Sequence, residues 1–409
     1  MCLLHHIAGA FTQQPEELKD RISTKAGDLI KRSCADIDPA RLIDYHTHVA
    51  GIGQGTGAFV NPKMLAWRYP LHRLKFKVYL SAGAVSDVDN ADAQIIERLV
   101  RLITSIDGHG KHRLLAFDKN YHRDGTANLA KTEFYVPNDY TFTLAGQNPD
   151  CFEPVISVNP YRSDALTELE RGAKRGAQMV KWLPNAMGID PADELCDPFY
   201  QKVKELGLIL LSHGGEEKAV EAEEDQRLGN PLLLRRALDH GVKVIVAHCA
   251  GLGDNEDLDS PQRKQVPNFD LFLRLMSEKR YEGILFADIS AMTQYNRIGR
   301  PLTTILQRED LHGRLVNGSD YPLPAINVLI RTGALHKQGY ITREERVCLN
   351  EIYDYNPLLF DFVLKRAIKV PGTEQRLPAS IFMANTNLEA GSADVPSAPS
   401  AKREYLVNP

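Results

Sequence analysis

The chain has 409 residues, of which 43% are hydrophobic, and its formal net charge is −4 from 49 basic and 53 acidic side chains. It is long enough to bury a large core, but it lacks the basic excess of a nucleic-acid-binding protein and any apolar run of the roughly 18 residues that a membrane span needs. Six cysteines without CxxC spacing indicate a reducing compartment rather than a disulfide framework, so we predict a cytoplasmic protein.

The first predicted strand ends in two histidines. In LIDYHTHVAG, residues 42–51, His46 and His48 are two positions apart. In an extended strand both side chains therefore point to the same side. Two imidazoles that share one space can bind a metal ion, although HxH also occurs by chance in many sequences.

A long segment, residues 52–110, separates this strand from the next. It begins with the glycine-rich run GIGQGTG and contains a helical pattern at 93–106. The glycine-rich run lacks the GxGxxG spacing and the Lys–Ser/Thr pair of phosphate-binding loops. We therefore predict a long insertion after the first strand, with a flexible loop at its start.

From about residue 110, apolar strand patterns alternate with helical patterns. Together with the first strand near residue 43, the strand patterns lie near residues 115, 155, 180, 210, 245, 286 and 316. The helical patterns cover residues 163–177, 197–207, 231–241, 268–279 and 301–309. Eight strand–helix units predict an α/β fold, a closed (β/α)8 TIM barrel.

The boundaries of this barrel are expected at residues 40 and 370. Residues 1–39 would form an N-terminal extension. The segment 371–409 becomes rich in Ser, Ala, Pro and Asn, so we predict a flexible C-terminal tail that packs loosely or not at all.

Four further strand patterns end in a polar residue shortly before Gly or Pro. These residues are Lys181 in VKWLP, His213 in LLSHGG, His248 in IVAHCAG and Asp320 in NGSDYP. The carboxyl ends of barrel strands converge on one mouth, where active sites lie. A single strand-end histidine is most often an ordinary polar residue with a local partner, but five independent strand ends of this kind indicate one shared site.

These motifs resemble the amidohydrolase superfamily, in particular the amidohydrolase 2 branch with its aminocarboxymuconate semialdehyde decarboxylase-like proteins and dicarboxylic lactone hydrolases. The resemblance covers roughly residues 40–365 and lies in DYHTH, KWLPNAMGIDP, SHGG, AHCAGLG and NGSDYP. It implies a divalent metal, with zinc as the first choice and one or two ions per chain. The implied ligands are His46, His48, His213 and Asp320, with His248 as a second-metal ligand or an acid–base group.

The chemistry of these side chains agrees with that implication. Imidazole and carboxylate suit zinc, and also manganese or iron, and a bound metal makes water acidic and polarises a carbonyl group. Asp320 could accept the proton of such a water as general base, and His248 could stabilise the developing oxyanion. Lys181 has three interpretations: a carboxylated bridge between two metals, as in binuclear relatives, a clamp for a substrate carboxylate, or a salt-bridge partner.

Two arginines are weaker candidates for binding an anionic substrate. Arg297 follows the seventh strand, and Arg227 ends the acidic run EKAVEAEEDQR, which we interpret as a solvated helix.

The leading hypothesis is a metal-dependent hydrolase that cleaves a C–N or C–O bond of a small carbonyl substrate. The alternatives are a nonoxidative metal-dependent decarboxylase (a lyase) of a small carboxylic acid and a noncatalytic metal-binding barrel. The expected partner is a small molecule rather than nucleic acid or membrane. The sequence leaves open whether the protein forms a homo-oligomer.

Overall fold

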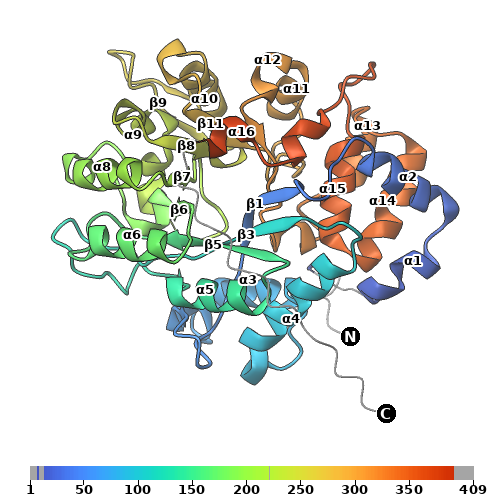
Figure 1. Cartoon of the computed structure of the whole chain (residues 1–409), viewed down its shortest axis with the longest axis horizontal. Helices are drawn as coiled ribbons and strands as arrows, with labels where there is room; N and C mark the ends of the chain where they lie inside the picture. The colour runs from blue at the N-terminus through green and yellow to red at the C-terminus, as the bar shows by residue number, and fades with distance from the viewer. Residues whose placement is uncertain (1–6, 9–12, 221, 391–409) are drawn as a thin grey trace.

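The computed structural model describes residues 7–8, 13–220 and 222–390. Its centre is a sheet of eight parallel strands in the order β1-β3-β5-β6-β7-β8-β11-β12 (Figure 1). The strands are β1 Ile43–His48, β3 Lys111–Leu115, β5 Phe152–Ser157, β6 Met179–Trp182, β7 Ile209–Ser212, β8 Lys243–Val246, β11 Leu285–Asp288 and β12 Leu315–Val316. All eight strands lie where the sequence patterns predict them.

The last strand returns to the first. The amide of Tyr45 donates to the carbonyl of Asn317 at 2.9 Å, and the amide of His48 donates to the carbonyl of Tyr321 at 3.0 Å. These bonds close the sheet into a barrel, as predicted. The barrel interior holds one apolar side chain or more from each strand, for example Ile43, Leu115 and Phe286.

Strand β1 contains a β-bulge. Asp44 pairs with His112, but the next pair joins Thr47 to Leu114, so three residue steps on β1 oppose two on β3. Tyr45 lies in the barrel interior, and His46, its direct neighbour, faces the same interior nearer the strand end because the bulge shifts the alternation. Bulges often re-aim side chains next to active sites in this way.

Helices cover the outside of the barrel. They include α5 Asn138–Gln147, α6 Ala165–Lys174, α8 Asp197–Glu205, α9 Arg235–Asp239, α10 Asn268–Met276 and α11 Arg300–Gln307. The five predicted helical patterns are confirmed, although the first turn of 231–241 is not α-helical, because Pro231–Leu234 forms a 3-10 turn before α9. No helix within the described residues has both the length and the apolar character needed to cross a membrane.

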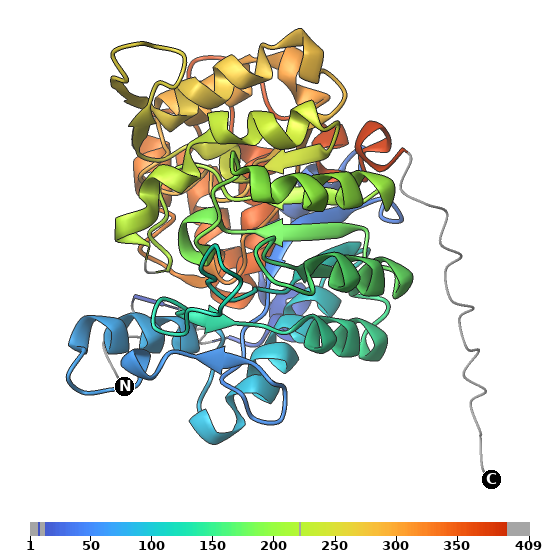
Figure 2. The ribbon, with the colours of Figure 1, turned by 90° about the vertical axis from the view of Figure 1, so that its left-hand side faces the viewer.

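The insertion after β1 is a folded layer. It contains β2 Phe59–Val60, which pairs with β4 Phe134–Tyr135, together with α3 Pro70–Ala82 and α4 Ala91–Thr104. The glycine-rich loop at its start is anchored rather than loose, because the Asp92 carboxylate accepts hydrogen bonds from the amides of Ile52 and Gly53 and from the Thr56 hydroxyl. Figure 2 shows α3, in blue, and the red α16 (Thr386–Glu389) at opposite ends of the molecule.

Both ends of the described chain pack against the barrel. Helix α2 Thr24–Cys34 lies beside α14 Arg343–Tyr355 and α15 Pro357–Ala367 (Figure 1). The expected loose attachment from residue 371 is wrong for residues 371–390. Ile381, Phe382 and Leu388 have no exposed surface, and Leu388 completes the apolar cluster inside the barrel. Residues 391–409 lie outside the described residues.

Candidate metal centre

Three side chains from the first and last strand ends form a compact group of metal-ligand atoms. His46 Nε2 lies 3.1 Å from His48 Nε2, and Asp320 Oδ1 lies 3.4 Å from the former and 3.3 Å from the latter. Within the described chain, the ligand atoms of these three side chains all lie within 4.8 Å of one another, close enough to bind one metal ion.

The charge state of the group fits a divalent cation. Burial lowers the pKa of His48 to about 4, so its imidazole is neutral near pH 7. Burial opposes ionisation of Asp320, but His46 and a hydrogen bond with His48 together lower the pKa of this carboxyl well below its usual range. Neutral imidazole and ionised carboxylate are the forms that bind metals.

The chain brings the ligands together by a close backbone approach. The amide of Asp320 donates to the carbonyl of His46 at 2.7 Å. Gly318, two residues earlier, passes so near that an added Cβ would lie 2.7 Å from the Cβ of His46, so a larger residue would displace the ligand. The buried Lys365 of α15 donates to the carbonyl of Gly318 at 2.6 Å and holds this turn from outside.

The orientation of His46 depends on Asp288, a residue that the sequence analysis missed. The Nδ1–H of His46 donates to Asp288 Oδ2 at 2.9 Å, which leaves Nε2 free to face the other ligands. Carboxylates commonly orient metal-binding histidines in this way. Asp288 ends the seventh strand, in GILFADIS, so the strand-end rule that selected the other residues could also have found it.

Lys181 lies directly beside the group. Its Nζ is 3.2 Å from His46 Nε2, and the side chain is almost fully buried, which lowers the pKa of the ammonium group. Among the described residues, no carboxylate lies within ion-pair distance of this Nζ. The salt-bridge interpretation of Lys181 therefore has no partner here.

His213 and His248 lie in the same cavity but form a pair of their own. His248 Nε2 is 3.0 Å from His213 Nδ1, and His213 Nδ1 is also 3.3 Å from Glu217 Oε2. Their other nitrogens, His213 Nε2 and His248 Nδ1, are buried without a hydrogen-bond partner in the part of the chain that is described. Burial lowers the pKa of His213 to about 3, so this imidazole is neutral as well. The structure thus places His213 outside the three-atom group.

These residues surround the end of a cavity of about 580 Å³ at the mouth of the barrel. Arg297, a predicted candidate, also lines it and is only 5% exposed. Its Nη1 donates to Gln294 Oε1 at 2.8 Å, whereas Nε has no partner, and the described residues provide no carboxylate within ion-pair distance of it. An unpaired buried guanidinium is costly, so the geometry suits an anionic ligand.

The interpretation of the acidic run after β7 as a solvated helix is wrong in part. Glu217 is buried and lines the cavity, and its carboxylate accepts hydrogen bonds from the amides of Ala219 and Val220. Burial raises the pKa of this carboxyl group. The helical part begins later, as the 3-10 segment Glu223–Gly229.

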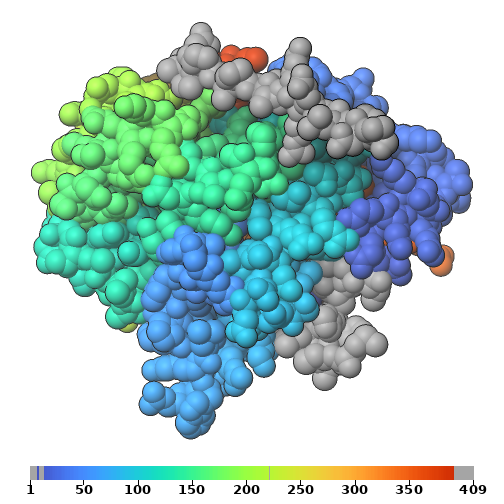
Figure 3. All heavy atoms as spheres, turned by 60° about the horizontal axis from the view of Figure 1, so that its bottom comes forward, coloured from blue at the N-terminus to red at the C-terminus, as the bar shows by residue number. Residues whose placement is uncertain are grey.

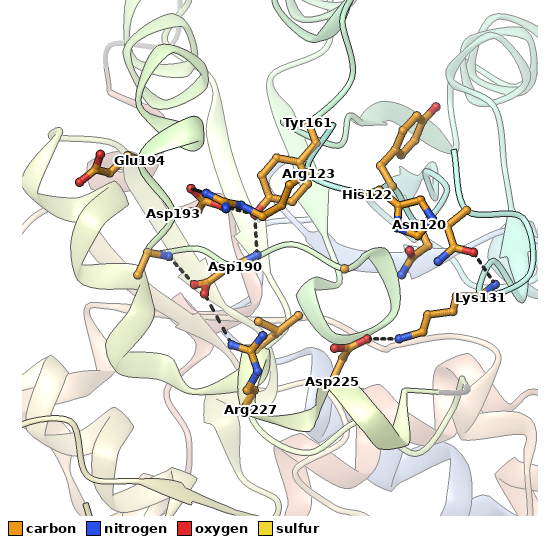
Figure 4. A pocket seen from close by; sticks show the side chains of 15 residues that line it. Asn120, His122, Arg123, Lys131, Tyr161, Asp190, Asp193, Glu194, Asp225 and Arg227 are labelled. Carbon is orange, nitrogen blue, oxygen red and sulfur yellow. Dashed lines mark hydrogen bonds and ion pairs between the residues drawn. The ribbon is translucent and has the colours of Figure 1, made fainter. Parts of the chain in front are cut away.

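Arg227 lines a different pocket, of about 590 Å³, which Figure 4 shows. There its Nη1 lies 3.6 Å from Asp190 Oδ2. The neighbouring cations are paired too, since Arg123 binds Asp193 and Lys131 binds Asp225. Arg227 does not line the cavity that holds the metal-ligand group, so its role in binding an anionic substrate stays a prediction.

Comparisons with known proteins identify the family of the chain. A family model described as amidohydrolase matches residues 43–325. An uncharacterised TIM-barrel protein from Bordetella bronchiseptica is 15% identical, with a TM-score of 0.46 over 76% of this chain and 94% of that one. A manganese-bound 5-carboxyvanillate decarboxylase from Novosphingobium aromaticivorans is 13% identical, with a TM-score of 0.47 over 86% and 97% of the chains.

A third solved structure, 4-oxalomesaconate hydratase from Rhodopseudomonas palustris, is 15% identical, with a TM-score of 0.39 over 68% of this chain and 81% of that one. No curated protein matches the chain.

Proposed function

Because the chain belongs to the amidohydrolase family, in its amidohydrolase 2 group, and carries a divalent-metal site of His46, His48 and Asp320, we propose that it is a metal-dependent hydrolase. The reaction we propose is cleavage of a C–N or C–O bond in a small carbonyl substrate. The observation that supports it most is the convergence of these three ligand atoms at the mouth of the barrel, where barrel enzymes have their active sites.

Zinc is the metal that we propose, since two imidazoles and a carboxylate are common zinc ligands. His213 would add a fourth ligand through Nε2, the nitrogen that has no partner within the described residues. When bound, the ion supplies Lewis-acid chemistry, which polarises a carbonyl group and makes water a better nucleophile near neutral pH.

The chain's own residues then divide the work. Asp320 accepts a proton from the attacking water and returns it to the leaving group, since its carboxylate is ionised and close to both histidines. His248, with an unpartnered Nδ1 in the cavity, hydrogen-bonds the carbonyl oxygen as it gains negative charge. Arg297 binds a carboxylate of the substrate and fixes its orientation.

Lys181 has two roles open in this proposal. Its Nζ lies beside His46 Nε2, so as a carboxylated side chain it would bridge a second metal. Without carboxylation, the Lys181 amine would bind the substrate instead of a metal. We propose the single-metal case, in which His46, His48, Asp320 and His213 would hold one ion and Lys181 contacts the substrate.

A nonoxidative decarboxylase is the second candidate. The observation that favours it is Arg297, a buried cation without a carboxylate partner among the described residues. A substrate that pairs with it would carry a carboxylate, and a decarboxylase requires one. The two candidates use the same metal group and differ in which bond breaks.

The test begins with zinc-reconstituted protein. We would offer it a panel of lactones, esters and amides and a panel of carboxylic acids, and measure acid release and CO2 release separately. The proposal expects hydrolysis, and Asp320→Asn should lower turnover by about 10²- to 10⁴-fold, the usual contribution of a general base. The control is Asp150→Asn, at an exposed aspartate that does not line the cavity, which should leave turnover unchanged.

Release of CO2 without hydrolysis would replace the hydrolase by the decarboxylase. Turnover of Asp320→Asn within threefold of the wild type would remove the proposed role of Asp320. A folded protein that binds no zinc, manganese or iron would overturn both candidates.

A further inference from the structure

The walls of the active-site cavity differ sharply in character from its end at the strands. We call the strand-end group His46, His48, Lys181, His213, His248 and Asp320 the floor. Above it, the lining is mainly apolar. We call six of these side chains the apolar wall: Leu71, Leu74, Val78, Phe117, Phe134 and Val136.

Half of the apolar wall comes from the insertion after β1. Leu71, Leu74 and Val78 occupy one side of α3, at positions three and four residues apart, which share a helix face. Phe134 lies in β4 and Val136 directly after it, and β4 pairs with β2 of the insertion. Figure 3 shows the blue segment that contains α3 protruding beyond the rest of the surface.

Charged groups near the wall are already paired. Lys75 Nζ lies 3.4 Å from Glu133 Oε2, and Lys218 Nζ lies 3.2 Å from Glu216 Oε2. Arg297 is different, because it has no ion-pair partner within the described residues, and its Nε has no hydrogen-bond partner. A ligand of this cavity therefore meets polar chemistry at the floor and at Arg297, and apolar surface along the wall.

Part of the wall is left open to water. The side chain of Leu71 is 80% exposed, and that of Leu74 is 48% exposed. Apolar side chains gathered at the opening of a pocket commonly mark a binding site, because covering them by an apolar group of the ligand is favourable. The cavity volume of about 580 Å³ lies within the range of about 300–1,000 Å³ that is usual for ligands of drug size.

We propose that the substrate carries a free carboxylate as well as the reacting group, together with an extended apolar group such as an alkyl chain of six or more carbons. The carboxylate pairs with Arg297, the reacting group lies at the floor, and the apolar group lies along Leu74 and its neighbours on the wall. This inference rests on the proposed function for the reacting group, but the binding of the apolar group can be measured without any reaction.

The experiment measures binding of a series of n-alkyl carboxylates, from butanoate to octanoate, to the zinc-loaded full chain by isothermal titration calorimetry. Each added methylene that enters the wall should tighten binding by about four-fold, the value for burial of one CH2 group. Leu74→Glu should weaken octanoate binding at least about ten-fold and change butanoate binding little, since the long alkyl chain would cover the glutamate carboxylate and remove it from water.

Leu65→Glu is the matched control. Leu65 belongs to the same insertion and is 53% exposed, but it does not line the cavity. It should leave the chain-length dependence of the wild type intact. If Leu74→Glu does not fold, Leu71→Glu replaces it, because a residue that is 80% exposed tolerates a charge.

Equal affinity for butanoate and octanoate would overturn the inference. An equal loss of octanoate binding in Leu74→Glu and Leu65→Glu would also overturn it, because the chain would then bind elsewhere or not specifically. These results are independent of the proposed function, which fails separately if the protein binds no zinc on reconstitution or if the zinc-loaded protein turns over none of the lactones, esters, amides and carboxylic acids offered to it.

Discussion

Asp288 shows how one side chain outside the ligand group controls it. Its Oδ2 accepts the Nδ1–H of His46, and its Oδ1 accepts the backbone amides of His248 at 2.7 Å and of Ser290 at 3.0 Å. The carboxylate therefore joins two strand ends and sets the tautomer of one ligand. A side chain can satisfy all three donors only if both of its terminal atoms accept hydrogen bonds, as the two oxygens of a carboxylate do.

We predict that Asp288→Asn weakens zinc binding by about 10- to 100-fold, the usual effect of losing such a partner. The asparagine NH2 group would face an N–H donor whichever way the amide turns, so one bond is lost. Competition with a chelator of known affinity measures the change, and Asp150→Asn is the control. A zinc affinity within threefold of the wild type would show that Asp288 does not orient His46.

At the scale of elements, the short C-terminal helix α16 closes the barrel at the end opposite to the mouth. Leu388 packs inside the barrel among side chains of the strands, including Ile43 and Tyr45. The neighbouring Glu389 accepts hydrogen bonds from the Tyr45 hydroxyl at 2.6 Å and from Arg113 at 2.8 Å. A segment far from the barrel in sequence thus completes its interior.

We predict that Leu388→Ala lowers the free energy of unfolding by about 2–5 kcal/mol, because it leaves a cavity in a packed interior. Urea unfolding followed by circular dichroism measures this change. Leu195→Ala, at a side chain that is 49% exposed, should change the free energy by no more than about 0.5 kcal/mol. A similarly small effect of Leu388→Ala would contradict the role of α16 as part of the interior.

For the whole molecule, the ligand group lies across the seam where the barrel closes. His46 and His48 belong to β1, and Asp320 follows β12, the strand that returns to β1. A metal that binds all three side chains links the first and last strands. Metal binding and stability of the barrel are therefore expected to be coupled.

We predict that removal of zinc by a chelator lowers the melting temperature and that added zinc restores it. Free zinc at 100 times its dissociation constant should add about 2.7 kcal/mol to the free energy of unfolding. Differential scanning calorimetry at several free-zinc concentrations measures the shift. In His46→Ala the melting temperature should no longer respond to zinc, and a response equal to that of the wild type would place the metal elsewhere.

Local patterns were sufficient to predict the barrel and much of its site. Each strand is a short apolar run bounded by turn residues, and the order of strands and helices follows the chain, so eight units imply closure. The HxH pair and Asp320 also follow from local rules, because strand alternation and strand ends are properties of a few neighbouring residues.

Distances between strand ends were decided only by the tertiary structure. The bulge in β1 turns His46 into the interior beside Tyr45, and closure of the barrel brings Asp320 to it, whereas His213 pairs with His248 instead. The tertiary structure also decided the position of Arg227, which composition could not assign to either pocket. It decided that of Leu388 too, whose polar sequence surroundings suggested a loose tail. Such placements depend on how loops and helices pack against distant strands, and no short stretch of sequence contains that information.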